Sequence, residues 1–247
     1  DAALLALSEN HQVEAPLKSY PEPETYTAQE TGDKVYFVDY DMVQSEMVLV
    51  SKGDAFNKEK MAEAQLFNTY FGSGLSSIVF QEIRESKSLA YSAFSSYSMA
   101  RKAGEEDYVY AYVGTQANKL PEAVDAMMDL MNDMPEAGEQ FEQAKESTLK
   151  KIAAQRITKS NIFWNYESLK KRGIDYDIRK DVYSDVQKME MADLKSFFDE
   201  NIKGGDYTTV VIGNKKDMDM KALSKLGEVK EMDIDYLFNY KQTDLKQ

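Results

Sequence analysis

The chain has 247 residues, a formal net charge of −13 and an apolar fraction of 43%. That length allows one large domain or two small ones, and the apolar fraction is sufficient for a substantial core. The acidic balance argues against nucleic acids and anionic membrane surfaces as partners, and the absence of cysteine excludes disulfides, thiolate metal ligands and cysteine nucleophiles.

Residues 1–32 are predicted to form a short helix and then a linker, which tethers a domain of residues 33–247. Pro16, Pro21 and Pro23 fall among Glu, Thr and Gln, a composition that favours extended backbone over a packed element. His11, the one histidine of the chain, lies in this leader and is expected to be solvated. Because the chain starts at Asp1 and not at Met, we expect it to have been trimmed or excised.

The rest of the chain alternates between strand and helix patterns. Runs rich in Val, Tyr and Phe predict strands, and apolar residues at spacings of three and four predict helices. In chain order we expect strands at 34–40 and 46–52, helices at 57–70 and 75–83, a hairpin of strands 91–99 and 107–115, helices at 120–134 and 139–159, a helix around 194–198, and a strand at 207–212. This order predicts an α+β fold with helices layered on one face of a mostly antiparallel sheet.

Several local signals refine these elements. Ser73 or Gly74 is expected to cap the second helix, and Asn118 the helix that follows the hairpin. Trp164 and Tyr166 are expected to close a corner between two helices. No apolar run reaches the ~20 residues of a membrane-spanning helix, so no membrane insertion is expected. We expect a soluble bacterial protein of the periplasm or the cytoplasm, and the composition does not choose between them.

One stretch, residues 71–92, carries a family resemblance. It contains Gly72-Ser73-Gly74, an amphipathic helix, and Arg84 seven positions before Tyr91. It resembles the pitrilysin/insulinase-type zinc metallopeptidases (peptidase family M16, the inverzincins), which include the mitochondrial processing peptidase. In that family such a stretch belongs to the half without zinc, whereas the zinc half carries His-x-x-Glu-His on a helix. That motif is absent here, because the chain has a single histidine.

The resemblance covers residues 34–229 and implies both a fold and a partner. Members pair two half-domains of the processing-peptidase type, which enclose a chamber between them. The chain would then be the C-terminal, non-zinc half, with no catalytic residue, metal ligand or cofactor of its own. Zinc is expected in a catalytic half, on the same polypeptide or on a separate subunit, and the Pro-containing leader favours the same polypeptide. A peptide is the expected substrate.

The resemblance assigns substrate binding to Arg84 and Tyr91. In the family's non-zinc half, the equivalent Arg and Tyr point into the chamber and hydrogen-bond the substrate near the scissile bond. The chemistry fits, since a guanidinium offers fixed donors to a peptide carbonyl and a phenol can donate to a developing oxyanion. The residues alone also allow a purely structural interpretation: a cation near a helix C-terminus and a half-buried strand tyrosine.

Other candidate sites are weaker. Gly72-Ser73-Gly74 precedes a helix but lacks the Lys and Ser/Thr of a phosphate-binding loop, so it is interpreted as a tight turn between closely packed helices. The acidic cluster at residues 105–107 lacks the pattern of a calcium loop and is interpreted as a solvated turn. Two hypotheses remain: the substrate-binding half of a zinc endopeptidase, or an inert scaffold of the same fold, as in core subunits of a respiratory complex.

Overall fold

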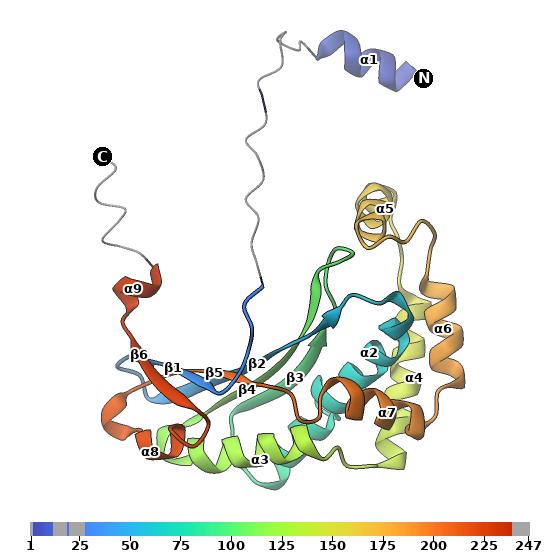
Figure 1. Cartoon of the computed structure of the whole chain (residues 1–247). Helices are drawn as coiled ribbons and strands as arrows, with labels where there is room; N and C mark the ends of the chain where they lie inside the picture. Colours follow the sequence, from blue (N-terminus) through green and yellow to red (C-terminus); the bar gives the residue numbers. More distant parts are fainter. Residues whose placement is uncertain (1, 12–18, 20–27, 239–247) are drawn as a thin grey trace.

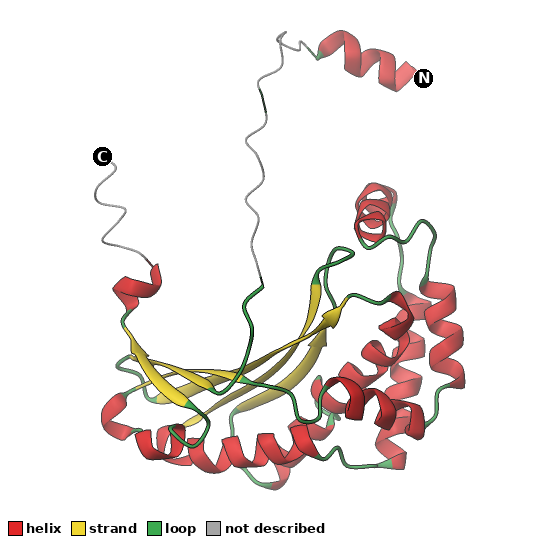
Figure 2. Ribbon diagram, in the orientation of Figure 1, coloured by secondary structure: helices red, strands yellow, loops and turns green. Residues whose placement is uncertain are grey.

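A computed structural model describes residues 2–11, 19 and 28–238 of the chain (Figure 1). Its centre is a six-stranded sheet with the strand order β3-β4-β2-β5-β1-β6. Helices cover one face of this sheet, and the described residues leave the other face open (Figure 2). The strands are β1 (Lys34–Asp39), β2 (Gln44–Ala55), β3 (Ser92–Ser98), β4 (Glu106–Gln116), β5 (Thr208–Gly213) and β6 (Glu228–Met232).

The sheet is mixed but mostly antiparallel. The pairs β3–β4, β4–β2 and β2–β5 are antiparallel, whereas β1 runs parallel to both of its neighbours, β5 and β6. This confirms the predicted α+β fold. The sequence analysis missed β6, because its sequence Glu-Val-Lys-Glu-Met is too polar for the strand pattern. Such polarity suits an edge strand, which has a neighbour on one side only.

The helices lie mainly between β2 and β5 in the sequence. They are α1 (Ala2–Asn10), α2 (Met61–Phe67), α3 (Leu120–Asn132), α4 (Gly138–Ala154), α5 (Ile162–Lys171), α6 (Arg179–Lys188), α7 (Met191–Asn201), α8 (Met220–Leu223) and α9 (Ile234–Phe238). Two π-helical segments, η2 (Asn68–Gly72) and η3 (Phe80–Ser86), and four short 3-10 turns complete the set. None of the helices in the described ranges combines the length and apolar character needed to cross a bilayer.

The structure corrects several predicted helix ends. Asn118 does not cap α3, because residues 117–119 form a 3-10 turn and Lys119 takes the cap position without a side-chain bond. The long helix ends at Ala154 instead of residue 159, and residues 153–156 are exposed, so no core contact extends the helix. The pattern of α6 was not recognised, although Val182 and Val186 are buried.

The core between the sheet and the helices is rich in aromatic side chains. The rings of Phe67 and Phe71 stack with centroids 5.0 Å apart, and Phe67 also packs against Phe197 from α7 at 5.6 Å. Tyr97 enters this core from β3, and its hydroxyl donates to Asp107 Oδ2 over 2.8 Å. Paired aromatic rings contribute about 0.5–1.5 kcal/mol beyond the area they bury. This cluster therefore fixes α2 and α7 against the strands.

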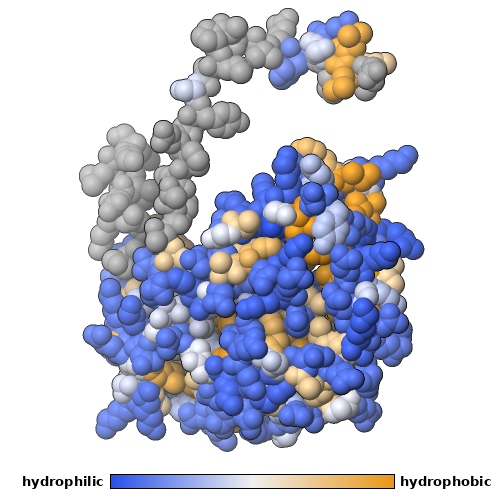
Figure 3. Space-filling model, turned by 45° about the vertical axis from the view of Figure 1, so that its right-hand side comes forward, coloured by the Kyte–Doolittle hydropathy of each residue, from blue (hydrophilic) through white to orange (hydrophobic). Residues whose placement is uncertain are grey.

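Helix α5 does not pack like the others. No residue of α5 is fully buried, and Trp164 is 69% exposed. The predicted corner involving Trp164 and Tyr166 is therefore not a buried one. In Figure 1 this helix stands apart from the layer under the sheet, and Figure 3 shows hydrophobic atoms gathered at the top of the folded body in the same region.

The last residues of the predicted leader bond to the sheet. The amide of Gly32 donates to Thr208 Oγ1, which in turn donates to the carbonyl oxygen of Gly32, each over 3.1 Å. The amide of Lys52 donates to Thr31 Oγ1 over 2.9 Å, and the Lys52 ammonium pairs with Glu30. The predicted proline linker, with Pro16, Pro21 and Pro23, lies outside the described residues. The domain boundary at residue 32 remains a prediction.

A pair of truncated chains tests what these contacts contribute. A chain that begins at Asp33 should unfold at a temperature on the order of 10 °C below one that begins at Gln29. It loses the bond between Lys52 and Glu30 and four hydrogen bonds between uncharged groups, which are worth about 0.5–1.5 kcal/mol each. Differential scanning calorimetry of both chains measures the difference. Equal melting temperatures would show that residues 29–32 only tether the domain.

Candidate functional site

The candidate site lies at the turn between η3 and β3. Gly72-Ser73-Gly74 forms the turn that precedes η3, but its close contact is with a strand and not with a helix. A Cβ on Gly72 would lie 2.6 Å from the carbonyl carbon of Ser95 on β3, and closer still to its oxygen. Only glycine fits under the strand at this point, so Gly72 sets the distance between η2 and β3.

The helix after this turn begins later than predicted. Ser77 caps the helix, and not Ser73 or Gly74 as predicted, because Ser77 Oγ accepts a hydrogen bond from the amide of Phe80 over 3.4 Å. Leu75, the first residue of the predicted helix 75–83, is 72% exposed, because it lies in the turn. Ile83 is fully buried, and it anchors the segment that carries Arg84.

A tight connection leads from η3 to β3. The amide of Leu89 donates to the carbonyl oxygen of Ile83 over 2.9 Å, and Ser88 has a positive φ of 51°. Lys119 Nζ donates to the carbonyl oxygen of Ser88 over 3.1 Å, and Thr115 Oγ1 donates to that of Leu89. These bonds tie the turn to β4 and to the start of α3, so the residues on either side of it are held in place.

Arg84 projects from η3 into solvent. Its side chain is 45% exposed, and its guanidinium carbon lies 4.8 Å from the centre of the Phe80 ring. Arg84 Nε is 3.8 Å from Glu85 Oε1, a loose ion pair at an exposed position. Such a pair is weak, so the guanidinium donors can turn to a ligand at little cost.

Tyr91 stands at the start of β3 and is 51% exposed. Its amide donates to the carbonyl oxygen of Gly114 over 2.9 Å, and its hydroxyl oxygen accepts from Gln116 Nε2 over 2.9 Å. A phenol can accept and donate at the same time. The bond from Gln116 therefore fixes the ring, while the hydroxyl proton has no acceptor among the described residues.

The turn brings Arg84 and Tyr91 to the same end of the sheet. Within the described ranges, no hydrogen bond or ring contact joins their two side chains. Their relative position is set by the backbone of the turn that connects them. Sequence reasoning missed Gln116, which orients Tyr91, because its contact crosses 25 positions of sequence. It also missed Lys119 for the same reason.

The open face of the sheet borders this site. One register row crosses all six strands through Phe94, Tyr112, Val48, Val210, Tyr36 and Lys230. Phe94 and Tyr112 stack with ring centres 5.1 Å apart, and partial burial raises the pKa of Tyr112. Tyr108 and Tyr110 extend the aromatic surface along β4, because alternate residues of a strand point to the same face. Gln116 continues this alternation, so it holds the Tyr91 hydroxyl at the end of the open face.

Comparisons with known proteins identify the family to which the chain belongs. Residues 2–148 match the family model described as the peptidase M16 inactive domain. The "Uncharacterized zinc protease YmxG" of Bacillus subtilis (strain 168) is 29% identical over 106 residues, which are 42% of this chain and 25% of that protein.

Solved structures give the same result at the level of the fold. The peptidase M16 inactive domain from Pseudomonas fluorescens superposes with a TM-score of 0.63 at 14% identity, over 78% of this chain and 46% of that one. A chain of complex III from Candida albicans superposes with a TM-score of 0.62 at 12% identity, over 94% of this chain and 57% of that one. The chain thus spans about half the length of these structures.

Proposed function

The chain belongs to the peptidase M16 inactive-domain family, and from this premise we propose that it is the substrate-binding, non-catalytic half of a zinc-dependent endopeptidase. In this proposal it forms one wall of a peptide chamber. Arg84 and Tyr91 clamp the substrate, and a second half, fused or separate, supplies the zinc site.

The observation that carries the proposal is that the exposed hydroxyl group of Tyr91 is held in one orientation. Gln116 fixes the ring through a 2.9 Å hydrogen bond, and no residue that the structure describes accepts the hydroxyl proton, so it can bond a ligand. An oriented phenol donor at an exposed position suits a peptide carbonyl that gains negative charge during hydrolysis. Arg84, exposed on the preceding helical segment, offers further donors to the same peptide backbone.

The open sheet face supports the role of chamber wall. Phe94 and Val210 are 41% and 38% exposed, and the tyrosines of β4 lie between their strands. A contiguous aromatic surface of this kind marks a place where another surface or an extended ligand packs. A second half placed over it would cover this apolar row and enclose the space in front of Tyr91.

Zinc is assigned to the other half on chemical grounds. Catalytic zinc takes about three protein ligands, mostly His and carboxylates. In the described part of the chain, no group of three or more His, Asp or Glu side chains is placed to hold a metal ion. The one histidine, His11, is exposed in the leader and distant in sequence from Arg84 and Tyr91. What this chain contributes is substrate orientation and hydrogen-bond donors.

The proposal predicts that substrate binding belongs to this chain, whereas zinc binding and peptide cleavage require the other half. The isolated chain should retain no stoichiometric zinc after dialysis and should not cleave unfolded peptides, since it supplies donors but no activated water. Adding a half that carries His-x-x-Glu-His should restore cleavage. Elemental analysis and a quenched fluorescent peptide assay measure both quantities. Turnover by this chain alone would contradict the assignment.

A second function is an inert scaffold of the same fold. The observation in favour of a scaffold is the structural similarity to a chain of complex III over 94% of this chain's length. A scaffold uses the open face for assembly and has no need of an oriented phenol at its end. Loss of activity on changing Tyr91 or Arg84, with assembly intact, therefore separates the two functions.

A further inference from the structure

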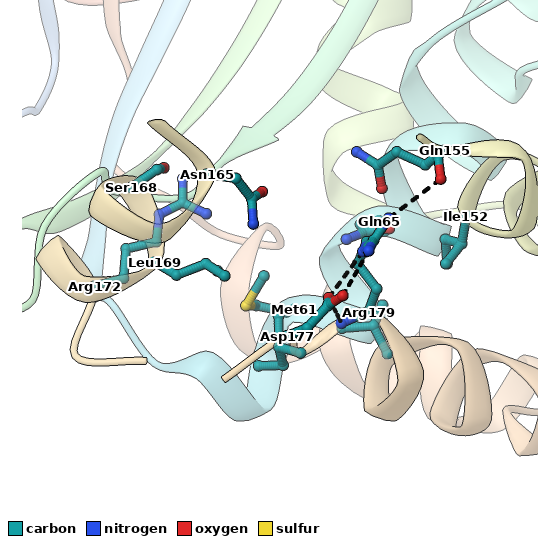
Figure 4. A pocket seen from close by; sticks show the side chains of 12 residues that line it. Met61, Gln65, Ile152, Gln155, Asn165, Ser168, Leu169, Arg172, Asp177 and Arg179 are labelled. Carbon is teal, nitrogen blue, oxygen red and sulfur yellow. Dashed lines mark hydrogen bonds and ion pairs between the residues drawn. The ribbon is translucent and has the colours of Figure 1, made fainter. Parts of the chain in front are cut away.

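A partly open cavity of about 170 Å³ lies among α2, α4, α5 and α6, and it shares no residue with the turn that carries Arg84 and Tyr91 (Figure 4). One wall is apolar, with Met61, Leu169 and Val182 among its residues. One water fills about 10–15 Å³ of such a volume, so the cavity has room for on the order of ten waters. A molecule of similar size would fit.

One charged pair in the wall is already satisfied. Asp177 accepts from Arg179 Nε over 2.8 Å and from Arg179 Nη2 over 2.5 Å, and Arg179 Nη1 donates to the carbonyl oxygen of Gln155 over 3.2 Å. The hydrogen bonds from Arg179 lower the pKa of Asp177, so this carboxylate stays ionised and neutralises Arg179. The pair leaves no net charge to bind a ligand.

Arg172, in contrast, brings to the cavity wall a guanidinium that forms no ion pair at hydrogen-bond distance with any described residue. Its Nε is buried and has no hydrogen-bond partner among the described residues, and its guanidinium lies over the Phe56 ring at 5.5 Å. Burial lowers its pKa, which attraction from Asp107 offsets in part. Asp107 attracts Arg172 without a hydrogen bond between them, because its two oxygens accept from uncharged donors, the hydroxyl of Tyr97 and the amide of Ala100. Arg172 as a whole is half-buried and lines the cavity.

The backbone holds Arg172 in this position. It is the C-terminal cap of α5, and Gly173 follows with a φ of 75°, a left-handed conformation that glycine adopts without strain. The amide of Ile174 then donates to the carbonyl oxygen of Leu169 over 3.0 Å, which closes the helix end. Ile174 is buried, so the cap is anchored in the core.

The face of α5 that borders the cavity supplies further polar groups. Asn165 lies three and four positions before Ser168 and Leu169, and these lie four and three positions before Arg172, so all four share one side of the helix. Figure 4 shows these side chains along the same helix at the border of the cavity. An amide and a hydroxyl thus accompany the guanidinium, and an apolar wall that includes Met61 completes the cavity.

We propose that this cavity binds a small organic anion that joins a carboxylate to an apolar body. The carboxylate bonds to Arg172, with Asn165 and Ser168 as supporting donors, and the apolar body packs against Met61 and Leu169. A bare inorganic anion would leave the apolar wall uncovered, and a neutral molecule would give the Arg172 guanidinium no charged acceptor. A free organic acid and the C-terminal residue of a peptide share this chemistry.

The first experiment uses the unmodified chain and N-acetyl-leucine as the probe. Nuclear magnetic resonance of the arginine Nε–H groups should show the Arg172 signal shifting and saturating at millimolar concentrations, whereas the Arg179 signal moves little. N-acetyl-leucine amide, which lacks the carboxylate, should bind at least about 10-fold more weakly, the expected effect of losing one charge-assisted hydrogen bond. Equal binding of acid and amide, or no saturation, would overturn the proposal.

The second experiment changes the cation. Arg172→Met should weaken binding of N-acetyl-leucine at least about 10-fold in calorimetry, whereas Lys171→Met, which removes the neighbouring exposed cation, should bind as the original chain does. Unchanged binding by Arg172→Met would refute the assignment. If that variant does not fold by circular dichroism, the Nε–H signals of the unmodified chain decide the question. Tighter binding of N-acetyl-Ala-Ala-Leu than of N-acetyl-leucine supports a peptide end as the source, and weaker binding supports a free acid.

Discussion

Tyr91→Phe, in an enzyme assembled with its zinc half, should lower kcat by about 10- to 100-fold while the fold and the zinc content stay unchanged. The physical reason is the hydroxyl proton of Tyr91, which has no acceptor among the described residues, on a ring that Gln116 holds in one orientation. If that proton meets the oxyanion, the bond is stronger in the transition state than in the bound substrate, and the loss appears in kcat. Steady-state kinetics on one peptide measures it.

Arg84→Ala should act differently. A guanidinium that holds a substrate carbonyl equally in the ground and transition states affects KM, so kcat/KM should fall about 10- to 100-fold through KM. The double variant should lose less than the product of the single losses, because both residues act on one bound peptide.

Matched controls come from the same chain. Tyr166→Phe changes an exposed tyrosine on α5, and Arg156→Ala changes an exposed arginine after α4, so both should leave kcat and KM unaltered. Activity equal to that of the original enzyme in both Tyr91→Phe and Arg84→Ala, with unaltered stability, would favour the scaffold function. A loss of zinc in either variant would instead indicate a structural defect.

Gly72→Ala should lower the free energy of unfolding by about 3 kcal/mol or more, at the upper end of the range for overpacked sites. The added Cβ would overlap the backbone carbonyl of Ser95, and neither partner can turn away as a flexible side chain could. Either η2 or β3 must move, and both carry parts of the core, such as Phe71 and Tyr97. The melting temperature should fall by roughly 6–12 °C for a domain of this size.

Gly138→Ala provides the control for this substitution. Gly138 begins α4, and a Cβ there meets no atom within 4 Å. Alanine should therefore leave stability unchanged or raise it by about 0.4–1 kcal/mol, because it restricts the unfolded chain. Urea denaturation of both variants measures the two free energies. If Gly72→Ala were as stable as Gly138→Ala, the proposed close contact of η2 with β3 would be wrong.

The sequence by itself determined the elements whose apolar period is long and clear. The strands over β1, β3, β4 and β5, the helix α3 and the shared face of Tyr108, Tyr110 and Tyr112 follow from local spacing. The stretch with Gly72, Arg84 and Tyr91 was also sufficient to identify the family, which the match to residues 2–148 confirms. These features depend on residues close together in the chain.

Only the tertiary structure decided what those residues contact. The sequence could not place Gln116 against Tyr91 or Phe94 on Tyr112, since these contacts depend on strand register. It could not show that Gly72 lies under β3 instead of between helices. The cavity around Arg172 is lined by residues from four helices. Of these, α6 was not predicted from the sequence, and α4 ends earlier than predicted. Side-chain periodicity is a property of neighbours in sequence, whereas register, close approach and cavities arise from packing between distant segments, which local propensity does not encode.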